Sequence, residues 1–471
     1  MKDINKSNKS CAAIIAKFLY HRKTDVVFGL QGGHIQPIWD HLYKLGIKIL
    51  DVRDEKAAVH MAQAYYHLTG KVGVAIVTAG PGVTNTVTGI ANAFISSASV
   101  LLIGGCCPIP QSNMGPLQDI PHVDILKSIT KYARTARVAE QVLRELDLAY
   151  SHSIGHLGEP GPSYIEIPTN ILRKDVNEKL LLKEWMEEKK AYKILPDNNM
   201  IKKAVETINS AKKPLLISGR GGNSAKSEIN NFINDNKVLY LDTQESRGLI
   251  SHEHPNNVYS LRSRVIAQTD CVILLGRKLD YQLAFGSKAI FKNAKFIRIS
   301  DNPYELIDNR RGSPEILADP GETLKKISVE IKSSNFDLNW IEGIKAKHKE
   351  RLNNISKMPV EKQGSDGKIH PAYIFQVINE LLGHDFIGIA DGGDILSFAR
   401  IGLRSKVYLD SGAFGCLGVG VPYAIAASEV DKTKKIVCVI GDGSFGFNAM
   451  ELDTAVRNNS NLCIIISNNA A

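Results

Sequence analysis

Gly441-Asp442-Gly443 and Asn468-Asn469 are the residues with the clearest potential for chemistry in this sequence. The first motif follows the apolar run KIVCVI and the second follows NLCIIIS, with 24 residues between the two motifs. The intervening segment FNAMELDTAVR has the apolar spacing of a helix. This order predicts a βαβ unit, whose right-handed crossover brings both motifs to the carboxyl ends of parallel strands.

Asp442 and Asn469 would converge on one ion if the two strands are neighbours, about 4.8 Å apart. One carboxylate and one amide oxygen, completed by ligand phosphates and water, suit octahedral Mg²⁺. Gly441 and Gly443 let the backbone approach a phosphate that a Cβ would obstruct. A lone Gly-Asp-Gly is usually a plain turn, but the strands, the helix, the spacing and the paired Asn together favour a metal–phosphate site.

Three other glycine-rich loops also follow apolar runs. AGPGVTN, residues 79–85, has the composition of a phosphate-binding loop or of a plain turn. DGGD, residues 391–394, could flank a diphosphate through its backbone amides, because its carboxylates would repel phosphate. SGRGG, residues 218–222, could hold an ADP moiety, either of FAD or of a CoA-type ligand, with Arg220 on the phosphate. For this last loop a simple turn is an equal alternative.

Three polar side chains in the first 120 residues are further candidates, and each has an ordinary structural explanation. Glu55 begins a helical segment, where the helix dipole alone favours a carboxylate and Asp54 can act as the cap. His34 in QGGH is more often hydrogen-bonded in a loop than in contact with a substrate. Gln118 in LQD, taken alone, indicates a surface residue.

Three α/β units are expected to position these residues. Short apolar strands alternate with helices over residues 1–172, 195–332 and 366–471, which predicts doubly wound parallel sheets. Residues 332–365 are polar and charged, as in a linker. A doubly wound unit should continue beyond the paired Asn, so we expect the last unit to be incomplete, the chain to be a fragment and its activity to be weak.

The composition excludes several classes of protein. Apolar residues make up 44% and charged residues 23%, as in globular proteins. The formal net charge is +9, but Lys and Arg are interleaved with acids, which argues against nucleic-acid binding. No apolar run reaches 18 residues, so no membrane span is predicted. A dehydrogenase is excluded because no G-x-G-x-x-G precedes an acidic residue at the required spacing.

The seven cysteines indicate a reducing compartment. Their number is odd, and no two of them have the spacing C-x-x-C. Cys271, Cys438 and Cys463 lie in apolar strand-like runs. We therefore expect buried, reduced thiols and a cytoplasmic location, with neither a disulfide framework nor a zinc site.

With these motifs, the sequence resembles the thiamine diphosphate enzymes of the acetolactate synthase family over essentially its whole length. Besides GDG…NN, the resemblance is carried by QGGHIQPIWDHL, DVRDEKAAVHMAQAYYHLTG, VTAGPGVTNTVTGIANA, LQDI, ADGGD and GAFGCLGVGVP. Within the family these phrases are most similar to acetolactate synthase-like proteins and to 2-hydroxyacyl-CoA lyases. The resemblance implies a pyrimidine-binding domain, a middle domain and a diphosphate-binding domain, in that order.

The resemblance also implies roles for single residues. Asp442, Asn469 and the carbonyl oxygen of Ala471 would bind Mg²⁺. Glu55 would be the catalytic carboxyl, hydrogen-bonded to a pyrimidine nitrogen of the cofactor. Leu417 would hold the two cofactor rings in a bent form. Gln118, which matches a family Gln near the thiazolium, and His34, which could reach the substrate, are the other catalytic candidates. Expected cofactor contacts, from the resemblance or from the loops described above, are those of Gly80, Pro81, Asn85, Gly392, Gly393, Gly441, Gly443 and Ser444.

The expected activity is acetolactate synthase-like condensation or decarboxylation of 2-keto acids such as pyruvate, with thiamine diphosphate and Mg²⁺ as cofactors. One alternative is a 2-hydroxyacyl-CoA lyase that releases formyl-CoA and an aldehyde. Another is a non-catalytic regulatory or structural relative, against which the retained Glu55, Asp442 and Asn469 argue. The family further implies a homodimer or homotetramer, with Glu55 of one subunit serving the cofactor held by another.

Overall fold

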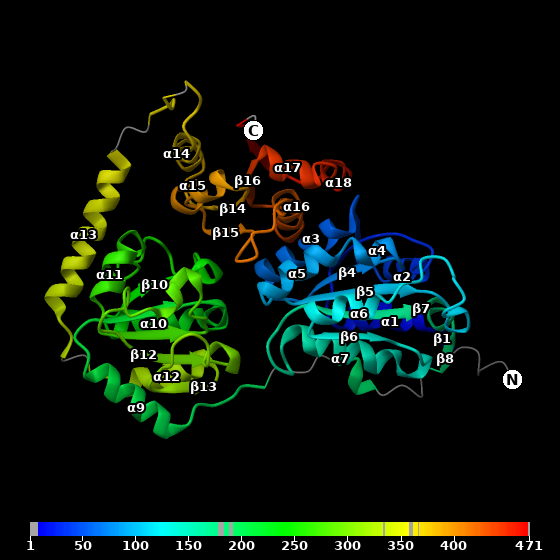
Figure 1. The fold of residues 1–471 in the computed structure, drawn as a ribbon, viewed down its shortest axis with the longest axis horizontal. Coiled ribbons are helices and arrows are strands. Elements are labelled where there is room, and N and C mark those ends of the chain that lie inside the picture. Colours follow the sequence, from blue (N-terminus) through cyan, green and yellow to red (C-terminus); the bar gives the residue numbers. More distant parts are fainter. Residues whose placement is uncertain are drawn as a thin grey trace. The chain divides into compact units, whose positions relative to one another are not determined.

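The computed structural model describes residues 8–177, 183–187, 192–332, 335–357, 361–365 and 367–469. The chain divides into two compact units (Figure 1), one formed by Met1–Ala191 with Gln363–Ala471 and the other by Tyr192–Lys362. The first unit is therefore discontinuous in sequence, and the second is inserted into it. Within the described ranges, no helix is both long enough and apolar enough to cross a membrane. The cytoplasmic location stays a prediction.

The N-terminal part of the first unit is built on a six-stranded parallel sheet in the order β3-β2-β4-β5-β7-β6. Its strands are β2 (Val26–Leu30), β3 (Lys48–Asp51), β4 (Gly73–Val77), β5 (Val100–Cys106), β6 (Tyr132–Thr135) and β7 (Ser163–Pro168). Its helices are α1 (Cys11–His21), α2 (Gln36–Lys44), α3 (Glu55–Thr69), α4 (Pro81–Thr84), α5 (Val87–Ile95), α6 (His122–Leu126), α7 (Val142–Ile154) and α8 (Thr169–Leu172). A short antiparallel pair joins β1 (Asn8–Ser10) to β8 (Asp175–Asn177).

Successive side chains on these strands enter two different apolar cores, as expected of strands covered on both faces. In β4, Val74 and Ile76 pack with residues of α1, α2 and α7. Ala75 and Val77 pack instead with residues of α3 and α5. The near-continuous apolar runs in this part of the sequence therefore reflect burial on both faces of the sheet.

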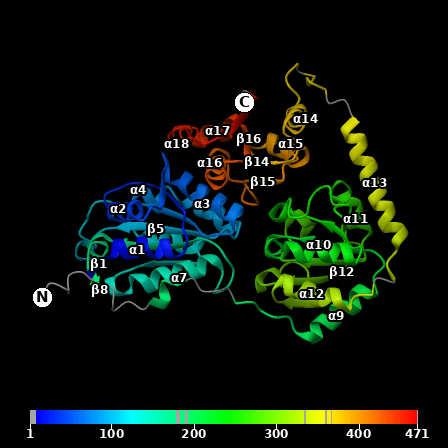
Figure 2. The same ribbon diagram turned by 180° about the vertical axis from the view of Figure 1, so that it is seen from behind.

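Helix α3 is buried on nearly all sides. Asp54 caps its start by accepting a hydrogen bond from the Lys56 amide, and Gly70 ends it in the left-handed conformation. One side of α3 packs on its own sheet, and another packs on α16 (Gly420–Val430) from the C-terminal part of the same unit (Figure 1 and Figure 2). Helix α3 is therefore shared between two sheets.

The C-terminal part of the first unit is a four-stranded parallel sheet in the order β15-β14-β16-β17. Its strands are β14 (Phe386–Asp391), β15 (Val407–Asp410), β16 (Lys435–Gly441) and β17 (Cys463–Ser467). Its other helices are α14 (Pro371–Leu382), α15 (Asp394–Gly402), α17 (Asp442–Asn448) and α18 (Glu451–Arg457). In β16, Val437 and Val439 pack in the core with α14 and α15, whereas Cys438 and Ile440 face the core that contains α16.

The second unit is a five-stranded parallel sheet in the order β10-β9-β11-β12-β13. Its strands are β9 (Pro214–Ser218), β10 (Leu239–Leu241), β11 (Cys271–Leu275), β12 (Lys295–Ser300) and β13 (Glu315–Leu317). Its α-helices are α9 (Asn198–Asn209), α10 (Lys226–Asp235), α11 (Arg262–Gln268), α12 (Pro320–Glu330) and α13 (Leu338–Lys357). Most of the charged segment that composition assigns to a linker is thus the helix α13.

The predicted fold class is confirmed: the chain is an α/β protein with three parallel sheets of six, five and four strands. All seven cysteines are free, and six of them are buried as expected. The prediction of a buried Cys463 is wrong, because this residue begins β17 at the edge of its sheet and its side chain is exposed.

His60 in α3 is fully buried, and this burial, with a smaller effect of Lys56, lowers the pKa of its imidazole from 6.5 to about 3. Below pH 6.5, His60 therefore binds a proton in the unfolded chain but stays neutral in the folded chain. Acid consequently favours the unfolded state. Between pH 7.5 and pH 5, we predict a loss of about 2 kcal/mol more unfolding free energy in the wild type than in a His60→Gln variant. Urea unfolding at both pH values measures this difference, and equal losses in the two proteins would contradict the prediction.

Candidate active site

The two motifs with the clearest metal-binding chemistry lie at adjoining strand ends. Strands β16 and β17 are parallel neighbours, and Gly441 pairs with Ser467. Asp442 directly follows β16 and begins α17, whereas Asn469 lies two residues beyond β17. The neighbouring strands assumed in the metal prediction are therefore present. Ala471, the third predicted ligand, lies outside the described residues.

A cradle of glycine backbone lies beside Asp442. Gly392 follows β14 with φ +129°, and a Cβ there would lie 3.2 Å from the backbone nitrogen of Gly441. A Cβ on Gly393 or Gly443 would meet no atom within 4 Å, so both residues border open space. Helices α15 and α17 begin at these two loops without a side-chain cap. Backbone N–H groups at uncapped helix starts favour an anion.

Asp391, at the end of β14, holds its carboxylate in hydrogen bonds with nearby backbone amides. Its side chain is fully buried, and Oδ2 accepts hydrogen bonds from the amides of Gly418 at 2.9 Å and Gly420 at 2.8 Å. Burial raises the pKa of this carboxyl to about 6, although these amides, the hydroxyl of Ser444 and the amide of Gly392 oppose the rise. Ser444 is also buried, and its hydroxyl is hydrogen-bonded to Asp391. Leu417 is 39% exposed and is therefore not an ordinary core leucine.

Glu55 lies against the loop that contains α4. Only 5% of Glu55 is exposed, and Nδ2 of Asn85 donates a hydrogen bond to its Oε2 at 2.9 Å. A Cβ on Gly82 would lie 3.5 Å from Oε1 of the same carboxyl. The structure thus brings together Glu55 and Asn85, which were predicted separately from a helix start and from a glycine-rich loop.

Gly80 and Gln118 also meet. Gly80 has φ +61° and ψ −117°, and a Cβ there would lie 2.7 Å from Cβ of Gln118. Pro81 is the first residue of α4 and is exposed. The amide of Gly80 donates to Nε2 of His122 at 2.8 Å. No motif points to His122, which is 42 residues from Gly80, so the sequence prediction missed it.

His34 lies at the same end of the sheet. Its Nδ1 is 3.3 Å from the hydroxyl of Thr78, and the ring is partly buried. Burial, and then the nearby His122, lowers the pKa of His34, which favours the neutral ring at neutral pH. His34, Gly80, Gln118 and His122 therefore gather at the carboxyl ends of β2 and β4.

Residues on both sides of Glu55 contact the helices α17 and α18, which follow the Gly-Asp-Gly motif. Oε1 of Glu451 in α18 accepts the amides of Arg53 at 2.9 Å and of Asp54 at 3.0 Å. Nζ of Lys56 lies 5.6 Å from the ring centre of Phe447 in α17. The turn before Glu55 is thus held by residues that follow Asp442. In the sequence, Glu451 is noticeable only as part of a helical pattern.

Comparison with known proteins gives three matches along the chain. Residues 9–127 match the N-terminal TPP binding domain of thiamine pyrophosphate enzymes. Residues 201–327 match the central domain of these enzymes, and residues 395–471 match their C-terminal TPP binding domain. The chain belongs to the thiamine pyrophosphate enzyme family.

Relatives of this thiamine pyrophosphate enzyme are similar over nearly its full length. It is 29% identical to human 2-hydroxyacyl-CoA lyase 1 over 98% of this chain and 81% of the relative. It is 29% identical to 2-hydroxyacyl-CoA lyase 2 of Danio rerio, over 97% of this chain and 79% of the relative. It is 28% identical to 2-hydroxyacyl-CoA lyase of Arabidopsis thaliana, over 97% of this chain and 82% of the relative. The predicted resemblance is confirmed at the level of the family.

The glycine cradle fits the cofactor of a thiamine pyrophosphate enzyme. The open space beside Gly393 and Gly443 borders uncapped N–H groups, which suits a diphosphate. In the described part of the chain, no three His, Cys, Asp or Glu side chains gather closely enough to hold a metal ion. A metal beside Asp442 would therefore need oxygens from an amide, a carbonyl and the diphosphate itself.

In the glycine-rich loop of the middle domain, Arg220 has carboxylate partners. Nη2 of Arg220 lies 3.2 Å from Oε1 of Glu305 and 3.5 Å from Oδ1 of Asp301. Glu305 is buried, so this ion pair is largely shielded from water. The guanidinium expected to bind a phosphate of ADP or FAD is thus paired with two carboxylates. Binding of an ADP moiety or of FAD at this loop stays a prediction.

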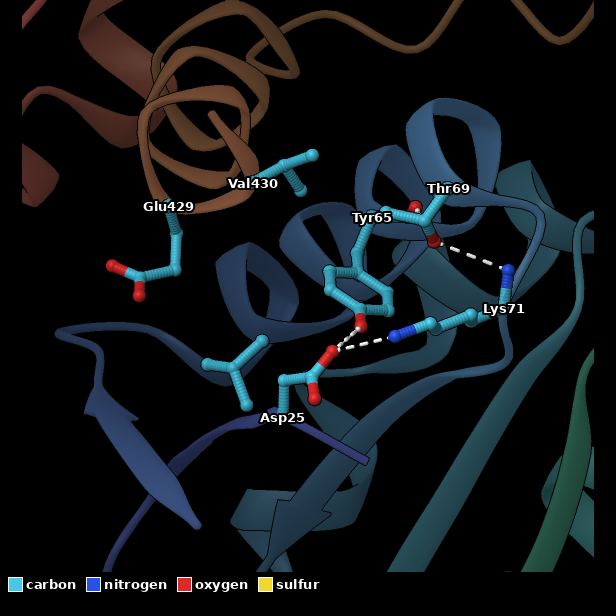
Figure 3. Close-up of a pocket in the computed structure, with 7 residues that line it drawn as sticks. Asp25, Tyr65, Thr69, Lys71, Glu429 and Val430 are labelled. Atoms are coloured by element: carbon cyan, nitrogen blue, oxygen red, sulfur yellow. Dashed lines mark hydrogen bonds and ion pairs between the residues drawn. The ribbon is translucent and has the colours of Figure 1, made fainter. Parts of the chain in front are cut away.

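A separate pocket lies at the other end of α3 (Figure 3). Its lining residues are Asp25, Val26, Tyr65, Thr69, Lys71, Glu429 and Val430. Asp25 accepts hydrogen bonds from Tyr65 at 3.0 Å and from Lys71 at 2.7 Å. Thr69 ends α3 and Glu55 begins it, so roughly 20 Å of helix separates the pocket from the catalytic candidate.

A Gly80→Ala substitution should destabilise the chain by about 1–3 kcal/mol, because the backbone angles of Gly80 are strained for any residue with a Cβ. The added methyl group would also collide with Gln118. Gly446→Ala is the matched control, because a Cβ on Gly446 meets no atom within 4 Å and α17 is helical there. Urea unfolding measures both variants, and equal stabilities would contradict the prediction.

Proposed function

We propose that this thiamine pyrophosphate enzyme uses thiamine diphosphate and Mg²⁺ to form or cleave a carbon–carbon bond beside a carbonyl group. The observation that carries the proposal is the position of Asp442 and Asn469 at adjoining strand ends, next to the open glycine cradle. When bound, the cofactor supplies the electron sink that lets a bond to a carbonyl carbon break or form.

In this proposal, the C-terminal sheet holds the diphosphate end of the cofactor. Asp442, Asn469 and the carbonyl of Ala471 bind the metal ion. The backbone around Gly392, Gly393, Gly441 and Gly443 lies against the phosphates. The carboxylate of Asp391 is buried and engaged by the amides of Gly418 and Gly420. Leu417 is exposed next to the Gly418 turn and supports the rings of the cofactor.

Glu55 is the proposed catalytic residue, and it holds a proton at a pyrimidine nitrogen of the cofactor. Asn85 fixes Oε2 of this carboxyl, and burial keeps water away from it. Gly80 and Pro81 form the neighbouring wall, Gln118 lies over Gly80, and His34 reaches toward the substrate.

Two substrate classes remain as proposals. Condensation or decarboxylation of 2-keto acids such as pyruvate is favoured by Arg220, because its pairing with Glu305 and Asp301 engages the guanidinium that was expected to bind a phosphate of a CoA-type ligand. Cleavage of a 2-hydroxyacyl-CoA is favoured by the names of the relatives. We rank the 2-keto acid reaction first.

The enzyme is proposed to act as a homodimer or homotetramer. Helix α17 and the segment around α18 carry exposed apolar side chains, with Phe447, Met450 and Val456 exposed by 57%, 72% and 75%. Apolar side chains gathered at a surface in this way are typical of contacts between proteins. A second copy of the chain is the partner that the family implies.

An Asp442→Ala variant should bind thiamine diphosphate with Mg²⁺ at least about 100-fold more weakly, since even outer-shell substitutions at metal sites cost about 10–100-fold. Asp431→Ala is the matched control, because Asp431 is a partly exposed carboxylate that precedes the same strand β16 and has no part in the proposed metal site. Isothermal titration calorimetry measures both affinities. Equal affinities in Asp442→Ala and the wild type would contradict the metal site.

Product analysis distinguishes the substrate classes. Pyruvate with thiamine diphosphate and Mg²⁺ should yield acetolactate, and a 2-hydroxyacyl-CoA should yield neither formyl-CoA nor an aldehyde. Formation of formyl-CoA and an aldehyde would reverse the ranking. If the protein binds the cofactor but converts neither substrate, a non-catalytic relative becomes the better description.

A further inference from the structure

His122 is a buried histidine whose two ring nitrogens both have defined partners. It begins α6, and 1% of its side chain is exposed. Nδ1 lies 2.9 Å from Oε2 of Glu166, and Nε2 lies 2.8 Å from the amide nitrogen of Gly80. The proposed reaction assigns no role to His122 or to Glu166.

These partners select one tautomer of the ring. The backbone amide of Gly80 can only donate, so Nε2 of His122 must be the acceptor and carry no proton. The ring proton is therefore on Nδ1, where it is donated to Glu166. Because the Nε2 lone pair is already used, His122 cannot accept a proton from a substrate without releasing Gly80.

Glu166 is built to hold this ring in place. The residue lies in β7 and is 7% exposed. Its Oε1 accepts the hydroxyl of Thr135 at 2.6 Å, and its Oε2 accepts the hydroxyl of Tyr164 at 3.0 Å. With His122, three donors satisfy the carboxylate, so its charge is stabilised and its orientation is fixed.

The Gly80 amide, which is hydrogen-bonded to His122, is connected to Glu55 through one short helix. Gly80 adopts a strained backbone conformation immediately before α4. Asn85 follows α4, and its side chain donates to the Glu55 carboxyl. One turn of helix therefore separates the peptide fixed by His122 from the amide that fixes Glu55.

We propose that His122, oriented by Glu166, is a positioning residue. It fixes the position of the Glu55 carboxyl through the Gly80 peptide, α4 and Asn85. The proposal rests on the proposed catalytic role of Glu55. It predicts that loss of His122 leaves the diphosphate site intact, because that site lies on the C-terminal sheet, but misplaces the carboxyl that activates the cofactor.

The test compares His122→Ala, His122→Gln and the control His21→Ala, an exposed histidine at the end of α1. Calorimetry measures the affinity for thiamine diphosphate with Mg²⁺. Proton NMR after acid quenching measures how fast the thiazolium C–H of the bound cofactor exchanges with D₂O. The exchange rate reports the position of Glu55 without any substrate.

In His122→Ala we expect affinity within about threefold of the wild type and exchange slowed at least about tenfold, since a misplacement of about 1 Å can cost about 100-fold. The amide of Gln accepts from Gly80 and donates to Glu166, so His122→Gln should restore exchange to within about threefold of the wild type. His21→Ala should match the wild type in both measurements.

Exchange in His122→Ala as fast as in the wild type would overturn the positioning role while leaving the proposed function intact. Failure of the wild type to bind thiamine diphosphate with Mg²⁺ would overturn the proposed function itself. If His122→Ala does not fold, ¹⁵N NMR of the wild-type ring decides, because a proton on Nε2 would overturn the proposal and a proton on Nδ1 supports it.

Discussion

The carboxylate of Glu451 is the interaction on which the rest of the candidate site depends, because it joins the two sheets of the first unit beside Glu55. Its Oε1 accepts two backbone amides, and its Oε2 accepts the hydroxyl of Thr454 at 2.6 Å. The side chain is almost fully buried, and burial raises its pKa. A buried carboxylate is costly unless it is hydrogen-bonded, and here three donors offset that cost. Since two of the donors are backbone groups, no side-chain change in the turn removes them.

Asp391 and Glu166 follow the same physical rule at two other strand ends. Each is a buried carboxylate that accepts hydrogen bonds from residues at or just before the start of a helix, from Gly418 and Gly420 in one case and from His122 in the other. These two buried carboxylates therefore fix the backbone segments that donate hydrogen bonds to them. Oδ1 of Asp391 has no hydrogen-bond partner among the described residues, which is in keeping with the raised pKa of this group.

Local patterns predicted the elements of this fold better than its contacts. The spacing from Asp442 to Asn469 predicted two neighbouring parallel strands, because strand, helix and strand allow few arrangements. Apolar runs do not predict the short edge strands β6 and β15, since neither is continuously apolar. The pairing of Arg220 with Glu305 was missed for a different reason: an arginine after a glycine turn looks the same whether its partner is a phosphate or a carboxylate.

Contacts between distant segments were beyond the reach of the sequence. His122 meets Glu166 across 44 residues, and Glu451 meets Arg53 across 398. Neither pair belongs to a motif, and a buried histidine or glutamate has no local pattern that distinguishes it from an exposed one. The candidate residues themselves could be listed from motifs, but the groups that orient them became visible only in three dimensions.

Because α3 packs against two sheets, one of its partners is made much later than the helix itself during synthesis on the ribosome. Cys416, which meets His60 of α3, lies 356 residues further along the chain. At a synthesis rate of about 5–20 residues per second, this interval corresponds to roughly 20–70 s. During that time the middle domain can fold, but one side of α3 has no partner. The nascent chain therefore presents an uncovered apolar helix for most of its synthesis, which is the kind of surface that chaperones bind.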